Sequence, residues 1–244
     1  MSYQHFGLWQ NNRRLTSFLV GMVFLMTAAP AFAEFKPRDR KPSSENSRAG
    51  GSRGCPSNGG IPMTQLAPQT YIGKTSSTRP TLVWYMSSPQ NVRFRLAEFD
   101  SANNLKQIGQ VKKIPTRVGI NKLKLPHDYS ELTVGKTYLW QIAIDCENDS
   151  IVRRAEFTVI NRESLANKQY TSIPESVNYY AKNELWYEAL EEALKTTDNG
   201  KLGQAGATLV KELAQSEILM GKEAYRKNIQ QRIEYLQKIA SERI

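Results

Sequence analysis

Alternating apolar and polar positions dominate the middle of the chain and predict short strands. Between residues 92 and 96, apolar side chains alternate with Arg93 and Arg95, so one face of this strand should be buried and the other wet. The strongest alternation follows later, with one face made by Tyr138, Trp140, Ile142, Ile144 and Cys146. The segment around Trp84 is rich in aromatic and branched side chains. We therefore expect residues 61–163 to form an antiparallel β-sandwich domain.

The segment that leads into the strongest strand carries a short motif, Leu132-x-x-Gly135-Lys-Thr-Tyr138. It resembles the tyrosine corner of immunoglobulin-like and fibronectin-like sandwiches, in which the tyrosine hydroxyl bonds back to the preceding loop. The motif favours an immunoglobulin-like sandwich, with structural roles for Trp84, Gly135, Tyr138 and Trp140.

Near residue 165 the hydrophobic period changes from that of strands to that of helices. Ser172-Ile-Pro-Glu175 has the spacing of a capping box with proline in the first turn. Residues 179–194 resemble the helix-turn-helix of a tetratricopeptide unit, although only one unit is visible and a lone helical hairpin would serve as well. We expect a helical region over residues 172–244, and the fold class is α+β.

The N-terminus has the layout of a secretory signal. Arg13 and Arg14 precede an apolar stretch, and Ala31-Phe-Ala33 supplies the small residues that a signal peptidase reads, so residues 1–33 should be removed. The alternative is an uncleaved anchor, because the apolar stretch is about as long as a membrane span. Residues 34–60 are mostly Pro, Gly, Ser and Asn, which predicts a flexible linker.

The net charge and the distribution of cations limit which classes of binding partner we expect. The formal charge is +10, and removal of residues 1–33, which hold two arginines and no acid, leaves +8. The cations are spread and do not interleave with aromatic side chains, so no nucleic-acid platform is expected. An envelope protein or an anionic polysaccharide or lipid surface is the expected partner. The predicted contact residues are Arg93, Arg95, Trp186 and Tyr187.

Few residues suggest catalysis, and we expect neither cofactor nor metal. After residue 33 the chain has one histidine, His127, beside Asp128, and a loop histidine is usually structural. Four acids fall at calcium-loop positions, namely Asp145, Glu147, Asp149 and Glu156, but Ser150 stands where that loop needs glycine. An acidic hairpin turn is the simpler interpretation. The alternative function is an envelope hydrolase or transferase that acts on an anionic glycan through Asp128, Asp145 or Asp149.

The chain has two cysteines, Cys55 and Cys146. In an exported protein they would persist as a disulfide that ties the linker across the sandwich. Chain entropy makes such a bond worth about 4–5 kcal/mol at most. The alternative is two unpaired buried thiols.

An ordered series of short motifs resembles the cyanobacterial exported proteins classed as domain of unknown function 928. The motifs are Arg53-Gly-Cys55, Thr64–Pro68, Arg79–Tyr85, Leu132–Trp140, Ile144-Asp-Cys146 and Leu185–Leu190. The resemblance covers about residues 50–220 and implies an exported cyanobacterial protein that has the cysteine pair; it supplies no catalytic residues. We expect a non-enzymatic binding or scaffolding protein of the periplasm, outer membrane surface or extracellular space.

Overall fold

A computed structural model describes residues 1–2, 35–48, 60–147, 150–161, 169–198 and 200–242. The chain divides into two compact units, Met1–Ala31 and Phe32–Ile244, and the description below concerns the second. The predicted signal segment, residues 1–33, lies outside the described residues except for its first two. Within the described ranges, no helix has both the length and the apolar character that crossing a bilayer requires.

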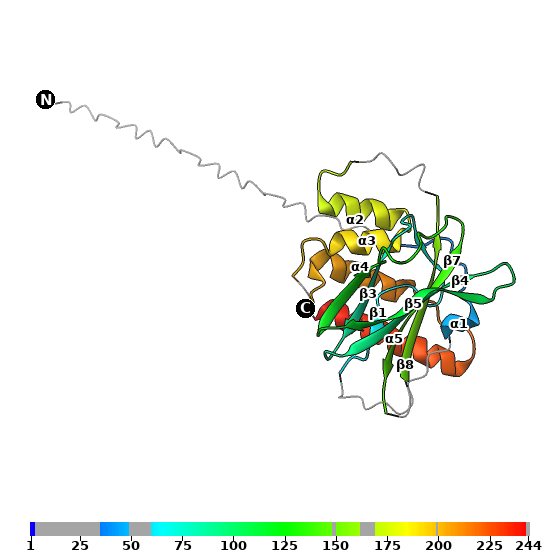
Figure 1. Ribbon diagram of the computed structural model, residues 1–244. Coiled ribbons are helices and arrows are strands. Elements are labelled where there is room, and N and C mark those ends of the chain that lie inside the picture. Colours follow the sequence, from blue (N-terminus) through cyan, green and yellow to red (C-terminus); the bar gives the residue numbers. More distant parts are fainter. Residues whose placement is uncertain (3–34, 49–59, 148–149, 162–168, 199, 243–244) are drawn as a thin grey trace. The chain divides into compact units, whose positions relative to one another are not determined.

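Two β-sheets form the body of the second unit (Figure 1). The smaller has the order β1-β3-β6, made by Thr64–Gln65, Thr81–Met86 and Gly119–Lys124. The larger has the order β2-β8-β7-β4-β5, made by Gly73–Thr75, Ser150–Val159, Thr137–Asp145, Asn91–Phe99 and Leu105–Pro115. Neighbouring strands are antiparallel except β2 and β8, which are parallel. The predicted α+β class with antiparallel sheets is confirmed.

The predicted alternation sets the register of the larger sheet. Phe94 of β4 lies opposite Ile142 of β7, and Leu96 lies opposite Trp140, so all four side chains are on the same face. These side chains are fully buried, whereas Arg93 and Arg95 on the other face are exposed. Every residue of β3 is buried, including Trp84. Both sheets and the helices contribute to one hydrophobic core.

The motif before β7 makes the hydrogen bond that it predicts. The Tyr138 hydroxyl accepts from the backbone N–H of Thr133, at 2.8 Å. Gly135 lies between them with φ +85°, a left-handed conformation that glycine adopts without strain. Its own N–H donates to the Val159 carbonyl of β8, at 2.7 Å. The structural roles predicted for Tyr138 and Gly135 therefore have a physical basis: they fasten the loop to two strands of the larger sheet.

Five helices occur among the described residues: α1 (Glu45–Arg48), α2 (Ile173–Lys182), α3 (Trp186–Ala193), α4 (Gly203–Ser216) and α5 (Glu223–Ser241). Ser172 caps α2, where its hydroxyl accepts from the Glu175 N–H, as the sequence predicts. Helices α2 and α3 form a hairpin, and α4 packs on both α3 and α5 (Figure 1). The predicted helical region and its first hairpin are thus present.

Residues 35–48 pack on the fold, and here the prediction of a flexible linker over 34–60 is wrong. We call residues 35–48 the N-terminal strap. Phe35 is buried with its ring 4.9 Å from that of Trp186, and its N–H donates to the Glu212 carboxylate of α4, at 2.8 Å. The Arg38 N–H donates to Glu184, at 2.9 Å. Of the rest of the predicted linker, Glu34 and residues 49–59 lie outside the described residues.

The strap follows the fold closely because its polar backbone finds distant partners. Ser43 N–H donates to the Thr70 carbonyl, and the Lys41 carbonyl accepts from the Ile72 N–H. The side chains of Ser44 and Ser47 donate to the buried carboxylate of Glu156 on β8. A polar, serine-rich segment can therefore be ordered without much apolar side-chain burial, since its hydrogen bonds are satisfied by the rest of the molecule.

Candidate functional site

Two of the four predicted contact residues belong to the core. Trp186 is fully buried and donates its indole N–H to the Leu66 carbonyl, at 2.8 Å. Tyr187 is also buried, and its hydroxyl accepts from the indole N–H of Trp140, at 3.3 Å. The prediction that Trp186 and Tyr187 form an interaction surface is therefore wrong. Aromatic side chains at helical spacing here join α3 to the sheets, which is their commoner role.

The other two, Arg93 and Arg95, are exposed on the outer face of the larger sheet. Arg93 pairs with Asp145 of β7, with its Nε 2.7 Å from Oδ2. The same hydrogen bond raises the pKa of the Arg93 guanidinium and lowers the pKa of Asp145. Both side chains are well exposed, so this pair adds little stability. Arg95 remains available to a partner at this face.

The acids proposed for catalysis do not converge. Asp145 binds Arg93 on the outer face of the larger sheet, whereas Asp128 pairs with Lys112, which lies opposite the buried Phe94 and so belongs to the inner face. The ion pair with Lys112 lowers the pKa of Asp128. A general acid at neutral pH needs the opposite shift. Asp149 lies outside the described residues.

The other predicted features are a loop histidine, a calcium-like pattern of acids and a cysteine pair. His127 is exposed in the loop before the tyrosine motif. Glu156, the last position of the calcium-like pattern, is occupied by the serine hydroxyls of the strap. No cluster of three or more metal-binding side chains occurs in the described part of the chain. Cys146 is not a free thiol, but Cys55 lies outside the described residues, so the bond between them stays a prediction.

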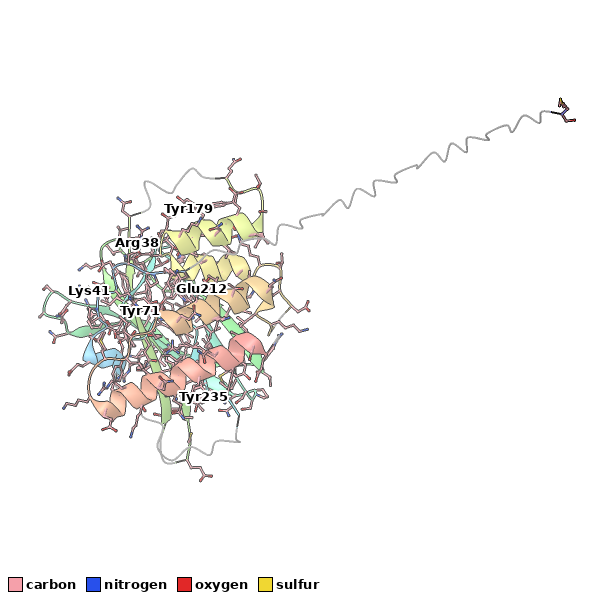
Figure 2. All side chains as sticks on the ribbon, turned by 180° about the vertical axis from the view of Figure 1, so that it is seen from behind. Arg38, Lys41, Tyr71, Tyr179, Glu212 and Tyr235 are labelled. Atoms are coloured by element: carbon pink, nitrogen blue, oxygen red, sulfur yellow. The ribbon has the colours of Figure 1, made fainter. Side chains whose placement is uncertain are left out.

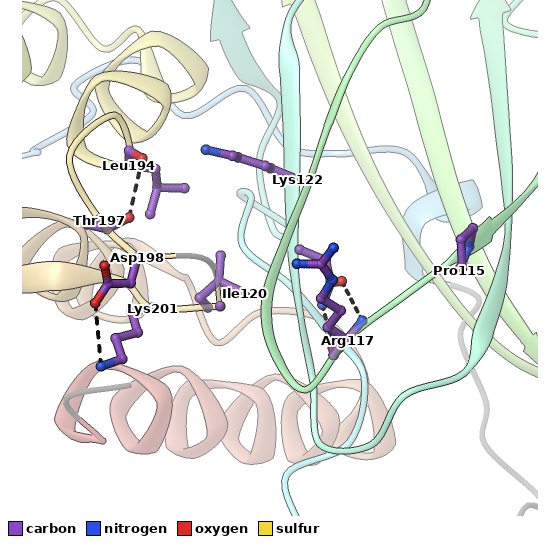
Figure 3. A pocket seen from close by; sticks show the side chains of 10 residues that line it. Pro115, Arg117, Ile120, Lys122, Leu194, Thr197, Asp198 and Lys201 are labelled. Atoms are coloured by element: carbon purple, nitrogen blue, oxygen red, sulfur yellow. Dashed lines mark hydrogen bonds and ion pairs between the residues drawn. The ribbon is translucent and has the colours of Figure 1, made fainter.

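One pocket lies between β6 and the loop from α3 to α4 (Figure 3). It has a volume of about 300 Å³ and is lined by three cations, Arg117, Lys122 and Lys201. Lys201 is directed toward Asp198, with 3.7 Å between Nζ and Oδ2, and Lys122 extends toward Leu194 instead (Figure 3). The three cations therefore do not meet at one point, and this pocket is a poor anion site.

A second pocket combines burial with converging positive charge. It has a volume of about 450 Å³ and lies between β8, β1 and α5. Its charged lining residues are Arg153, Arg154 and Arg232, and no acid is among the described residues that line it. We call it the arginine pocket. Because β2 pairs with β8 only from Phe157 to Val159, the edge of β8 around residues 152–154 is left to this pocket.

Arg232 of α5 forms the floor of the arginine pocket. It is buried, and its Nη1 and Nη2 donate to the carbonyls of Gln65 and Ala67. Nη2 also lies 3.3 Å from the fully buried carboxylate of Glu217. Its Nε has no hydrogen-bond partner among the described residues. Because this Nε is also shielded from solvent, Arg232 gives the pocket positive charge while its own donors are engaged or enclosed.

Arg153 supplies a second guanidinium with less compensation. It lies opposite Ile142 in the β7–β8 register, so it stands on the core-facing side of the sheet, and it is half-buried. Its Nη1 donates to the Val152 carbonyl at 3.0 Å, and no carboxylate of the described residues pairs with it. Burial and then the charge of Arg232 lower the pKa of Arg153. Arg153 and Arg232 are thus two nearby cations, and only Arg232 has an acidic partner among the described residues, Glu217. The uncompensated positive charge favours a bound anion.

Arg154, the next residue along β8, also lines the arginine pocket, and its hydrogen bonds are made outside it. Its Nε donates to Gln141 at 2.8 Å, and its Nη1 donates to the carbonyl of Asn46 in the strap at 3.1 Å. Burial and the charge of Arg95 lower its pKa, so Arg95 is close enough to act on it. Positive charge thus extends from the pocket onto the outer face of the larger sheet.

The sequence carries one signal for this site, on β8. Ala155, Phe157 and Val159 alternate on β8, and the same period places Arg153 on their buried face. A charged residue in phase with a buried stripe is expensive unless it is paired or functional. Arg232 gave no comparable signal, because its partners lie far away in the sequence.

The comparisons with known proteins give a family and little else. A family model described as Domain of Unknown Function (DUF928) matches residues 48–222. No curated protein matches. A solved structure titled "X-Ray photoreduction of Polysaccharide monooxygenase CBM33" aligns with 11% identity over 39% of this chain and 63% of that chain, at a TM-score of 0.25. The chain thus spans less than two thirds of that structure, and such a distant likeness carries no argument.

Proposed function

We propose that this chain, which belongs to the family described as Domain of Unknown Function (DUF928), binds an anionic ligand without transforming it. The observation that carries the proposal is Arg153: a half-buried guanidinium beside the buried Arg232, with no carboxylate partner among the described residues. A bound oxyanion would accept from Arg153 and offset the repulsion between Arg153 and Arg232.

We place this binding at the cell envelope. The signal-like layout of residues 1–33 and the predicted bond between Cys55 and Cys146 support export. The family resemblance implies the same location and a cyanobacterial source, and both stay predictions. An immunoglobulin-like sandwich and a tetratricopeptide-like hairpin remain our proposals for the finer fold class, supported by the Tyr138 hydrogen bond and by the α2–α3 pairing.

Binding is favoured over hydrolysis by the positions of the acids. Retaining and inverting glycosidases hold two carboxyl groups about 5–10 Å apart across the reacting bond. Asp128 and Asp145 belong to opposite faces of the larger sheet, and each is paired with a cation. The arginine pocket offers cations and neutral amides, which bind and orient a ligand but provide no carboxylate for acid–base chemistry.

The test is equilibrium binding to soluble polyanions. The processed chain is titrated with polygalacturonate, with polyphosphate and with neutral dextran at physiological salt, and the polyanion that binds is then used with variants. We expect Arg153→Gln to weaken binding about tenfold, because a charge-assisted hydrogen bond is lost. Prolonged incubation with the same polymer should release no new reducing ends.

Arg117→Gln is the matched control. Arg117 is exposed in the pocket of Figure 3, and the variant makes the same change in net charge without touching the arginine pocket. Equal losses in Arg117→Gln and Arg153→Gln would mean that binding reports only overall charge, and the proposal would then be abandoned. Steady release of reducing ends from a bound glycan would instead favour the enzyme.

A further inference from the structure

We infer that the anion in the arginine pocket belongs to a sugar: the site fits an acidic saccharide unit, an oxyanion carried on a hydroxylated ring. This inference rests on the proposed binding function and specifies its ligand. It depends on three features of the pocket, which are the position of one half-buried and one buried guanidinium group, its size, and the neutral polar side chains around them.

The guanidinium groups define where the oxyanion sits. Arg153 has one described hydrogen bond, to the Val152 carbonyl, so most of its donors stay available, while the buried Arg232, whose donors are engaged or enclosed, adds its positive charge beneath. Arginine presents parallel N–H groups that match a carboxylate or a sulfate or phosphate ester equally well. The common chemistry is therefore an oxyanion held between α5 and the open edge of β8.

The size of the pocket leaves room for more than a simple inorganic ion. A volume of about 450 Å³ lies within the range of small-molecule sites, which is roughly 300–1,000 Å³. It would otherwise hold about fifteen waters at liquid density. An oxyanion between Arg153 and Arg232 therefore leaves most of the space for the body that carries it.

The rest of the lining suits a body rich in hydroxyl groups. Asn228, Gln231, Arg232 and Tyr235 follow one another at i, i+3, i+4 and i+7, which places them on one side of α5. Asn228 and Gln231 are exposed, and Tyr235, seen on α5 in Figure 2, is half-buried. Carboxamides both donate and accept, as sugar hydroxyls do, and a tyrosine ring offers an apolar face to sugar C–H groups.

A lipid head group fits less well. The only fully apolar side chains in the described lining are Pro62, Val152 and Ala224, which are small and cannot form a channel for an acyl chain. The lining also includes the polar side chains of Ser47, Thr64 and Gln69. The ligand is therefore expected to be polar throughout, as an acidic saccharide is.

Calorimetric titration of the processed chain with four probes tests this inference. The probes are a galacturonate trimer, its neutral counterpart maltotriose, inorganic phosphate, and vesicles of phosphatidylglycerol in phosphatidylcholine. A sulfated trisaccharide replaces the galacturonate trimer in a parallel series, because both carry the shared chemistry. We expect at least one acidic trisaccharide to bind about tenfold more tightly than either maltotriose or phosphate, since each of these offers only part of the required contacts.

Two variants separate the roles within the site. Arg153→Gln should weaken the acidic trisaccharide about tenfold. Gln231→Ala, at an exposed position where folding is safe, should weaken it about threefold and leave phosphate binding unchanged, because only the sugar ring reaches that side chain. Arg117→Gln should change neither.

The outcomes distinguish this inference from the proposed function. If phosphate binds as tightly as the acidic trisaccharides and Gln231→Ala has no effect, the inference of a saccharide ligand is overturned, while the proposal of anion binding stands. If vesicles bind in an Arg153-dependent way and the trisaccharides do not, the ligand is a lipid and the sugar is again overturned. If none of the anionic probes binds, or if Arg117→Gln matches Arg153→Gln, the proposed function fails as well.

Discussion

Glu217 holds Arg232 in a buried ion pair, with 3.3 Å between Oε1 and Nη2. The same carboxylate accepts from the backbone N–H groups of Gln69 and Thr70, at 3.0 and 2.9 Å, and from the Thr70 hydroxyl, at 2.6 Å. Glu217 follows α4 directly, so one acid joins the end of that helix, the loop before β2 and the floor of the arginine pocket. Glu217 thus fixes Arg232 from one side, while the Arg232 Nε has no hydrogen-bond partner among the described residues.

Replacing Glu217 by glutamine should destabilise the fold while preserving its shape. The variant leaves the buried Arg232 without its counter-ion, a change that typically costs about 3–5 kcal/mol. Urea unfolding followed by tryptophan fluorescence measures the free energy of unfolding. Glu223→Gln is the control, because that acid is exposed in an i,i+4 pair on α5 and should change stability by less than about 0.5 kcal/mol. Equal stabilities of the two variants would contradict the assigned role.

Trp186→Ala should be among the most damaging single substitutions. It removes a fully buried indole, its hydrogen bond to Leu66 and its contact with Phe35 of the strap. Large-to-small changes of this kind cost about 3–5 kcal/mol. Arg95→Ala, on the exposed face, should stay within about 0.5 kcal/mol of the wild type. Thermal and urea unfolding of both variants measure the difference, and a near-neutral Trp186→Ala would restore that residue as a surface candidate.

Two buried tyrosines predict a loss of stability at alkaline pH. Burial, and secondarily the nearby Glu217, raises the pKa of Tyr71, and burial likewise raises the pKa of Tyr187. Below about pH 10, the ordinary pKa of tyrosine, both states of the chain keep these protons and stability does not depend on them. Above it the unfolded chain ionises first, so the free energy of unfolding falls by up to about 1.4 kcal/mol per pH unit for each group.

Urea unfolding at about pH 9 and about pH 11 checks this slope. In Tyr71→Phe the baseline stability at the lower pH should fall slightly, because the hydrogen bond between the Tyr71 hydroxyl and Ser216 is lost. Its further loss between the two pH values should nevertheless be smaller than in the wild type, since one titrating group has been removed. An unchanged slope would show that Tyr71 ionises as readily in the folded protein as in the unfolded chain.

The predicted bond between Cys55 and Cys146 can be tested by mass. Reduction of the purified protein should add one hydrogen per sulfur, and only the reduced protein should react with iodoacetamide when denatured. Reduction should also lower the free energy of unfolding by about 4 kcal/mol, because the bond would close a long loop. Two thiols that alkylate without prior reduction would contradict the pairing.

The local periodicity of the sequence predicted the strands and helices, but it could not predict contacts between residues that are far apart in the chain. The period-2 pattern of β7 and the capping sequence of α2 depend on neighbouring residues, and both elements formed as expected. The N-terminal strap did not follow its composition, because its backbone is held by Glu156 and Glu212, which lie more than a hundred residues away. The arginine pocket could not be predicted for the same reason. Arg153 and Arg232 are far apart in the sequence and line one pocket only in the folded chain.

The anchoring of Phe35 bears on the order of events during maturation. Its ring is buried against Trp186 and its N–H is bound by Glu212, only two residues after the predicted cut that follows Ala33. A peptidase needs several extended residues on both sides of the bond that it hydrolyses, and a docked Phe35 would withhold them. Cleavage after Ala33, which remains a prediction, would therefore have to precede docking of the strap, so that the strap packs on the fold only after the leader has been removed.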